Sequence, residues 1–599
     1  MKGLLTMIAW ISLFVPPLIA TVLRQKLNMI AKKGKNNWIY EFLVEYVINI
    51  FFVNIIMMFC LNYIFKSQGN LVYKLNAYNN FAFKYMLLAL IVAIGIVGAK
   101  YVFQNKMKFT IDELKIPHIK NGKVLIWLYA TVLFTLNFVR IFDNNFWGDE
   151  TFTTNLVQQS FSKIVSITAA DVHPPLYYFI VRIFYLVFGK HGWVFHLVSL
   201  IPCFITIVFA MTVIWKKVAP EASLVLITLL CLSNNAVTYN VEVRMYSWAA
   251  LFVLFSFYEV YRLLQDGKTL NYVLFVFFSL AAAYTHYYAL LSVAFFYICI
   301  IGYTLFFRML DTKNIVAACL STVILYLPWM GIVIKTVMRS TDNFWLTTIP
   351  TFKESIDYLF SYQIDAEVGG VLIIGLLFVV AYETNFFRLN ISEQNNMNII
   401  VSTRNLRCSK EVFWIIAGLI SIFGTIIAGI VVSEIIRPFY LLRYIYPVSI
   451  VAWMVLGIGI SKLKGSKFYT FILICFMLLI FIPAYKSNYI YEKNDNIKLQ
   501  DTLYAMRDEI TSDKIILTNL THVGWTIAEY YFPDVKTELV NDKTFVGLQE
   551  TKEYILIVSS NEDVSTISKQ LNDEGFVCDL LYENGVLGTV PVDIYSIAH

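Results

Sequence analysis

Long apolar runs alternate with short polar connections along most of this chain. The longest apolar runs lie at about 4–23, 42–65, 84–103, 124–142 and 468–484. Each is long enough to cross the hydrocarbon core of a membrane as a helix. With the shorter runs between 175 and 460, the pattern predicts a polytopic α-helical membrane protein with about 13–15 transmembrane helices. The first run has no small-residue cleavage site, so we expect a retained helix rather than a signal peptide.

The composition supports this class and excludes others. Of the 599 residues, 58% are hydrophobic and 15% are charged, which is incompatible with a soluble globular protein. The formal net charge of +6 does not indicate nucleic-acid binding, because Lys and Arg form short clusters between apolar runs, as in cytoplasmic loops. Six of the eight cysteines lie inside apolar runs, so neither a disulfide framework nor a CxxC metal site is expected.

The basic clusters also predict which connections face the cytoplasm. They lie at about 24–35, 106–123, 383–410 and 461–467. The opposite, extracytoplasmic side then receives the first outer loop 143–175, Glu242–Tyr246, Thr285–Tyr288, Arg339–Trp345 and Arg437–Tyr444. Two apolar stretches between 175 and 215 occupy room for one crossing, so we expect the shorter, 176–188, to lie partly in the membrane interface. If that stretch spans fully, Glu242 and Arg244 would face the other side.

After the last apolar run the composition changes, and residues 486–599 are predicted to form a small extracytoplasmic α/β domain. Strands are expected at Lys514–Leu517, Tyr554–Val558, Cys578–Tyr582 and Asp593–Ile597, and helices at Leu503–Ile510 and Val564–Leu571. This sequence has neither a glycine-rich phosphate loop nor a paired-histidine motif, so we expect a structural or acceptor-docking role. The chain before this domain is predicted to consist of extra N-terminal helices with a cytoplasmic loop (1–122) and a transmembrane core (123–485).

Two adjacent acids, Asp149 and Glu150, open the first outer loop. On a helix their side chains point about 100° apart, so they are not expected to share one proton as a dyad. A carboxylate at the membrane boundary can act as a general base on an acceptor hydroxyl or amine, or hold a divalent cation. Two structural roles stay open beside these: a solvated loop acid, or a helix N-cap, because Asp149 precedes a helical run at Glu150–Ser162.

A histidine closes the same loop at the entrance of the next helix. Pro174 and Pro175 suit the first turn of that helix, which places His173 at its N-terminus, where a lipid phosphate is a suitable anion. Further positive charge on this side is expected from Arg244, Arg443 and Arg437. The alternative is that each arginine extends from the interface to water, and that His286 belongs to an aromatic interfacial belt.

The spacing of these motifs resembles a known family. The motifs are Trp147-Gly148-Asp149-Glu150, Asp171-Val172-His173-Pro174-Pro175-Leu176-Tyr177-Tyr178, Glu242-Val243-Arg244-Met245-Tyr246, Tyr284-Thr285-His286-Tyr287-Tyr288 and Arg443-Tyr444. Over roughly 124–485 they look like the GT-C glycosyltransferases, more closely glycosyltransferase family 39 and the RgtA/B/C/D-like proteins. These are related to protein O-mannosyltransferases and to the aminoarabinose transferase of lipid A. The chain departs from typical relatives in having three spans before the core and Val241 where a glutamine is frequent.

The resemblance implies an integral membrane enzyme with a GT-C fold. Such an enzyme transfers a sugar, with inversion, from a polyprenyl-phosphate carrier to an acceptor on the outer face of the membrane, here a glycolipid, wall polymer or protein. It implies Asp149 as the catalytic base or acceptor-orienting group, with Glu150 beside it, and His173 near the carrier phosphate. The other residues expected to bind substrate are Asp171, Glu242, Arg244, Tyr246, His286, Arg443 and Tyr444.

A cofactor and other functions are left open by the sequence. A divalent cation held by Asp149, Asp171 or His173 suits the chemistry of these ligands, but nothing in the sequence requires it. The alternative function is a transporter or flippase of a lipid-linked saccharide, which would place ionisable residues near the bilayer midplane on interrupted helices. Here they cluster at span ends on one face, which favours the enzyme. The richness in Asn, Lys and Ile suggests a bacterial plasma membrane.

Overall fold

The computed structural model describes residues 122–599 with interruptions. The residues outside the description are 1–121, 144, 308–310, 339–345, 347, 362–386, 392–396, 402–409, 437, 463–465, 519, 521–523, 540–547, 550–551 and 561–564. The expected N-terminal spans, the loop Arg339–Trp345, Arg437 and most of 383–410 therefore lie outside the described residues. The described residues of 122–355 and 414–599 belong to one compact unit, which contains every described site residue, and those of 356–413 belong to another.

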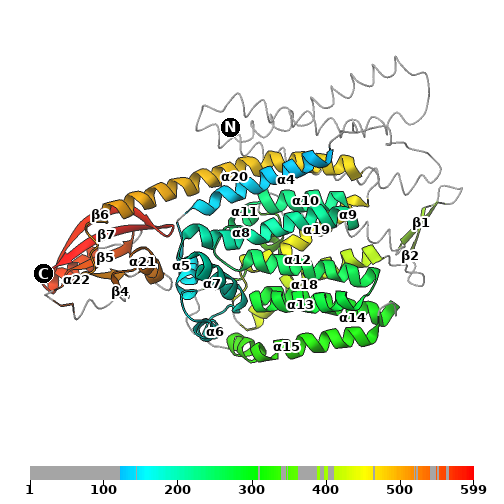
Figure 1. The fold of residues 1–599 in the computed structure, drawn as a ribbon, viewed down its shortest axis with the longest axis horizontal. Coiled ribbons are helices and arrows are strands. Elements are labelled where there is room, and N and C mark those ends of the chain that lie inside the picture. Colours follow the sequence, from blue (N-terminus) through cyan, green and yellow to red (C-terminus); the bar gives the residue numbers. More distant parts are fainter. Residues whose placement is uncertain are drawn as a thin grey trace, which may run out of the picture. The chain divides into compact units, whose positions relative to one another are not determined.

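The described membrane part is built of helices (Figure 1). They are α4 Gly122–Phe138, η2 Val139–Phe142, α5 Gly148–Leu156, α6 Phe161–Ala170, α7 Leu176–Phe188, α8 Gly192–Phe209, η3 Ala210–Ile214, α9 Trp215–Lys217, α10 Pro220–Leu232, α11 Asn234–Tyr239, α12 Tyr246–Gln265, α13 Thr269–Thr285, α14 Tyr287–Phe307, α15 Thr312–Met338, α16 Phe352–Leu359, α18 Lys410–Ile435, η4 Leu442–Ile445, α19 Tyr446–Ser461 and α20 Ser466–Ala505. Within the described residues, 8 helices are long and apolar enough to cross a membrane. The chain is thus a multi-pass membrane protein.

Shorter apolar helices pack among the spanning ones. Helix α7 has 13 residues, or about 20 Å, which is less than the roughly 30 Å of a hydrocarbon core, so its partial insertion stays a prediction. Helix α10 is buried along nearly its whole length between α19 and α20. At Gly457 of α19, an added Cβ would lie 2.5 Å from the Cα of Ala222. A small residue is needed here because the two helix backbones approach closely.

Helix α20 connects the membrane part to the C-terminal domain. It has 40 residues and continues through the boundary expected at 485–486, with Pro483 inside it. Near this boundary it contacts the end of α4, where the Tyr485 hydroxyl donates to the carbonyl of Leu136, and η2, where Arg140 pairs with Glu492. The sequence marks where the residues of this helix become polar rather than where the helix ends.

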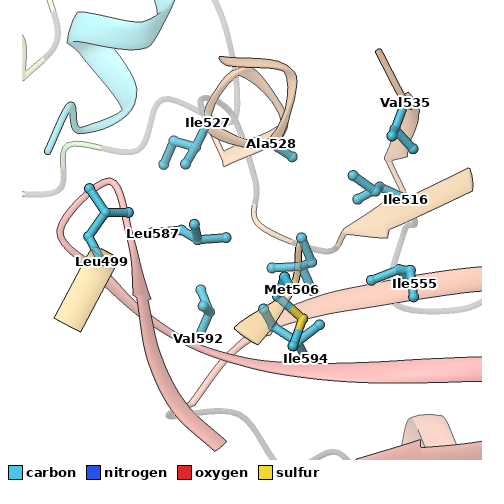
Figure 2. Packing of buried hydrophobic residues seen from close by; sticks show 11 residues of the cluster. Leu499, Met506, Ile516, Ile527, Ala528, Val535, Ile555, Leu587, Val592 and Ile594 are labelled. Atoms are coloured by element: carbon cyan, nitrogen blue, oxygen red, sulfur yellow. The ribbon is translucent and has the colours of Figure 1, made fainter. Parts of the chain in front are cut away.

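The C-terminal domain contains a mixed five-stranded sheet in the order β4-β3-β5-β7-β6. Its elements are β3 Ile515–Thr518, α21 Gly524–Tyr531, β4 Lys536–Leu539, β5 Tyr554–Ser559, α22 Ser565–Asp573, β6 Val577–Leu587 and β7 Val590–Ala598. Strands β3, β4 and β5 are parallel, and β7 runs antiparallel to both β5 and β6. Each predicted strand is present, whereas α21 and β4 were not predicted. Figure 2 shows the apolar core between the sheet, α20 and α21.

The second unit contributes few described elements. Within it, β1 Phe387–Ile391 and β2 Met397–Val401 pair antiparallel as a two-stranded hairpin. The sequence analysis predicted only a polar loop over 383–410 and missed the alternation of apolar and polar residues in Phe387–Ile391.

Candidate functional site

Helix α5 carries both acids of the loop 143–175. Trp147 precedes it in an extended conformation with ψ 172°, and the helix runs from Gly148 to Leu156. Asp149 and Glu150 therefore lie in its first turn, where the helix dipole favours negative charge. The helical run expected over 150–162 is split, because Ser160 caps a new helix by accepting a hydrogen bond from the Lys163 amide at 3.3 Å. The N-cap role considered for Asp149 belongs to Trp147 instead.

Two arginines from distant parts of the chain surround Asp149. Its Oδ2 atom lies 3.2 Å from Nη1 of Arg443 and 3.7 Å from Nη2 of Arg244. Nη1 of Arg244 also donates to the Asp149 carbonyl at 3.3 Å. Arg244 lies in the turn between α11 and α12, and Arg443 lies in η4, just before α19. Three helix ends thus meet at one carboxylate.

Glu150 faces a different environment from that of its neighbour. It is 4% exposed, and its Oε1 accepts from the Val243 amide at 2.7 Å while Oε2 accepts from the Trp147 amide at 3.2 Å. Burial, and next to it the charge of Glu242, raises the pKa of Glu150 well above its usual value. Both carboxylate oxygens are engaged with backbone groups, so this side chain fastens α5 to the 240–245 turn.

Glu242 lies beside the arginine pair and holds the indole of the N-cap residue. Its Oε1 accepts from Nε1 of Trp147 at 3.0 Å. Burial raises the pKa of Glu242 to about 7, against the opposing effect of the two nearby arginines. The Arg443 guanidinium lies 5.8 Å from the centre of the Trp147 ring, a cation–π distance. Trp147 therefore connects Glu242 to Arg443.

His173 and His286 stack on each other with ring centres 5.8 Å apart. The Tyr444 ring lies 6.2 Å from His173 and 5.2 Å from His286, and the Tyr246 ring lies 5.5 Å from His286. Nδ1 of His286 accepts from the Tyr288 amide at 3.2 Å, so a neutral ring carries its proton on Nε2. The structure brings together all four of these predicted site residues.

Both histidines are neutral near pH 7. Burial, followed by Arg244, lowers the pKa of His173 well below its usual value, and the same causes lower the pKa of His286 to about 3. The predicted anion site therefore receives no positive charge from His173, which lies ahead of the first residue of α7, Leu176. The positive charge comes from the two arginines.

The arginine pair has hydrogen-bonding capacity left over. The Nε atoms of Arg244 and Arg443 and the hydroxyl of Tyr246 are buried without a hydrogen-bond partner in the part of the chain that the structure describes. Buried donors of this kind carry a desolvation penalty unless a ligand binds them. An anion bound next to Asp149 would satisfy them.

The donor set suits an anion better than a metal ion. Over the described ranges, no group of three or more His, Cys, Asp or Glu side chains is arranged to hold a metal. Asp149 is already paired with two guanidinium groups, which would repel a divalent cation. Asp171 ends α6 as its C-cap and acts electrostatically on Arg244.

The overall arrangement resembles that of a solved protein in two states. The chain is similar to ArnT from Cupriavidus metallidurans in the apo state, with a TM-score of 0.51 and 11% identity over 79% of this chain and 98% of that one. It is similar to the same protein bound to undecaprenyl phosphate, with a TM-score of 0.50, 12% identity and the same coverage. The described chain therefore has an ArnT-like fold.

A family model matches part of the membrane region. Residues 172–332 match the model of the dolichyl-phosphate-mannose-protein mannosyltransferase family. This confirms the resemblance inferred from the sequence motifs. No curated protein matches the sequence significantly.

Proposed function

We propose that this protein is an inverting glycosyltransferase that moves a sugar from a polyprenyl-phosphate carrier to an acceptor on the outer face of a bacterial plasma membrane. The observation that carries the proposal is the placement of Asp149 between Arg244 and Arg443 at the ends of membrane helices. This arrangement combines a base with two cations that suit a lipid phosphate. The undecaprenyl phosphate bound to ArnT, which has the same fold, supports this choice of carrier.

Asp149 is assigned as the base. Its side chain is 18% exposed, and the arginines engage Oδ2, so Oδ1 can face an incoming acceptor. In one displacement, the acceptor O–H or N–H gives its proton to Asp149 and the acceptor atom bonds to the anomeric carbon. The bond from that carbon to the phosphate oxygen breaks, and its electron pair stays on the carrier phosphate.

The arginines are assigned to the departing phosphate. The donor is a phosphodiester with one negative charge, and the released polyprenyl phosphate gains a second as the bond breaks. Arg244 and Arg443 therefore bind the transition state more strongly than the ground state, which is the condition for catalysis. Their Nε donors, which have no hydrogen-bond partner among the described residues, are available for that phosphate.

The remaining predicted residues receive supporting roles. Tyr246, His286, Tyr444 and His173 form an uncharged aromatic surface suited to a sugar ring. Asp171 and Glu242 are proposed to bind sugar or acceptor hydroxyls at its edge. Glu150, expected beside Asp149 as a catalytic candidate, is assigned a positioning role because both its oxygens accept backbone N–H groups.

The test uses purified protein in detergent with a panel of polyprenyl-phosphate sugars and a membrane extract as the acceptor. The expected result is release of polyprenyl phosphate from at least one carrier, with the sugar attached to the acceptor in inverted anomeric configuration. Retained configuration would contradict the single displacement. In proteoliposomes, carriers that cross the membrane intact, without release, would favour the transporter instead.

A further inference from the structure

Helix α5, which carries Asp149, is also in contact with the C-terminal domain. Helix α21 packs against α5, and the turn between β6 and β7 contacts the residues just before it. We propose that the C-terminal domain positions Asp149 for sugar transfer, with Thr526 and Gly588 as the positioning residues. This inference rests on the proposed function of Asp149 and assigns the domain a role in that reaction.

Thr526 holds the first turn of α5 from the side of the C-terminal domain. The Thr151 hydroxyl can donate to the Gly148 carbonyl at 2.9 Å. The Thr151 and Thr526 hydroxyls share a hydrogen bond of 2.8 Å, in which either can be the donor. The Thr526 hydroxyl also lies 3.4 Å from the Gly148 carbonyl, and both threonines are buried. Their hydrogen bond fixes the turn that contains Asp149.

The chain leading into α5 is held by the same domain. The Phe146 amide donates to the Tyr531 hydroxyl at 2.8 Å, and the Phe146 ring lies 5.0 Å from the Tyr530 ring. The Thr589 amide donates to Oδ1 of Asn145 at 3.1 Å. An added Cβ at Gly588, whose φ is +56°, would lie only 2.5 Å from the Phe146 carbonyl oxygen.

These contacts with the C-terminal domain do not involve the Asp149 side chain. Gly148, Thr151 and Asn155 follow helical spacing on one face, and each contacts Thr526. Asp149 points from another face toward the arginines. A helix of 9 residues is marginal by itself, so its position depends on what packs against it. One side of α5 is held by the C-terminal domain and another by the arginine pair.

Helix α21 is fixed to the body of its domain. Figure 2 shows Ile527 and Ala528 of α21 directed into the core that contains Leu587, Val592 and Ile594. One helical turn apart, Thr526 contacts α5 and Tyr530 contacts Phe146, which precedes α5. A shift of the domain core would therefore move α21 and with it the first turn of α5.

The first test compares Thr526→Val with Thr537→Val. The two substitutions make the same change in the same domain, but Thr537 lies on β4 and has no described contact with α5. We expect Thr526→Val to lower kcat about tenfold with donor KM within about twofold of wild type, because a small misplacement of the base slows chemistry more than binding. Thr526→Ser, which keeps the hydroxyl, should restore most of kcat, and Thr537→Val should match wild type.

The second test places Thr526→Val in the Asp149→Asn background. If Thr526 acts through Asp149, it should cause no further loss of the residual turnover. Gly588→Ala should also lower kcat. Gly575→Ala is its control, because Gly575 has φ +88° and its nearest contact is His599, so the substitution imposes similar backbone strain without reaching Phe146.

The outcomes separate the two proposals. A wild-type protein that releases no polyprenyl phosphate from any carrier would overturn the proposed function. If the wild type is active and Asp149→Asn is not, a Thr526→Val variant equal to Thr537→Val would overturn the positioning role alone. An equal loss from Thr526→Val in both backgrounds would overturn it as well, because that result is expected of a general effect on folding.

Discussion

Arg443→Gln removes one of the two charges beside Asp149 and should slow transfer strongly. At an effective dielectric constant of about 20, a guanidinium and a phosphate charge about 4 Å apart interact by about 4 kcal/mol. The Arg443 side chain is 26% exposed, so solvent screens part of this interaction. The expected loss of transition-state stabilisation is about 2–4 kcal/mol, or about 30- to 1,000-fold in kcat/KM. The loss should appear in kcat, because the charge on the phosphate grows only as the bond breaks.

The assay measures initial rates of polyprenyl phosphate release at several carrier concentrations for wild type, Arg443→Gln and Arg443→Lys. Arg262→Gln is the matched control, since Arg262 also pairs with an acid, Glu259 at 3.3 Å, away from the site. Arg443→Lys should fall between wild type and Arg443→Gln, because it keeps the charge without the forked geometry. A folded Arg443→Gln variant with kcat/KM within about threefold of wild type would refute the assignment of this arginine to the leaving phosphate.

Three other predictions concern pH and stability. The pKa of Glu242 is raised to about 7, so the folded state is more stable when Glu242 is protonated. Between about pH 4.5 and 7, the Tm of the wild type should therefore fall relative to that of Glu242→Gln. A Tm difference between the two proteins that stays constant over this range would contradict the prediction. Glu150→Ala leaves the buried Val243 N–H and the partly buried Trp147 N–H without this acceptor. It should reduce stability by about 1–3 kcal/mol, measured by thermal unfolding in detergent; an unchanged Tm would show that these bonds are dispensable. Gly457→Ala should destabilise the protein by about 1–3 kcal/mol, because the added methyl group clashes with Ala222. Gly331→Ala is the control and should be neutral or stabilising, because an added Cβ there has nothing within 4 Å. Equal Tm values for the two variants would contradict the close packing of α10 and α19.

The parts of the fold that follow local patterns were predictable from the sequence. The membrane helix at 124–142 and strands β3, β5 and β7 follow from their apolar runs. Strand β4 was missed because Lys536–Leu539 is a short edge strand with exposed ends and little apolar content. The end of α20 was missed because its residues become polar near 486, whereas the helix continues to Ala505.

The candidate catalytic and binding residues of the site could be recognised in the sequence, but their contacts could not. Asp149 and its arginine partners are separated by 95 and 294 residues, and no local pattern indicates that these side chains meet. The neutrality of His173 depends on burial beside Arg244, which is a property of the folded protein. Thr526 has no sequence signal at all, because its role comes only from packing against α5.

The most direct measurement is the rate of acceptor-dependent polyprenyl phosphate release by Asp149→Asn, with Asp501→Asn, an exposed acid on α20, as the control. Both variants should retain the wild-type unfolding temperature. Loss of the base predicts a rate about 10²- to 10⁴-fold lower for Asp149→Asn and an unchanged rate for Asp501→Asn. A folded Asp149→Asn protein that releases polyprenyl phosphate at the wild-type rate would contradict transfer at the site between Arg244 and Arg443.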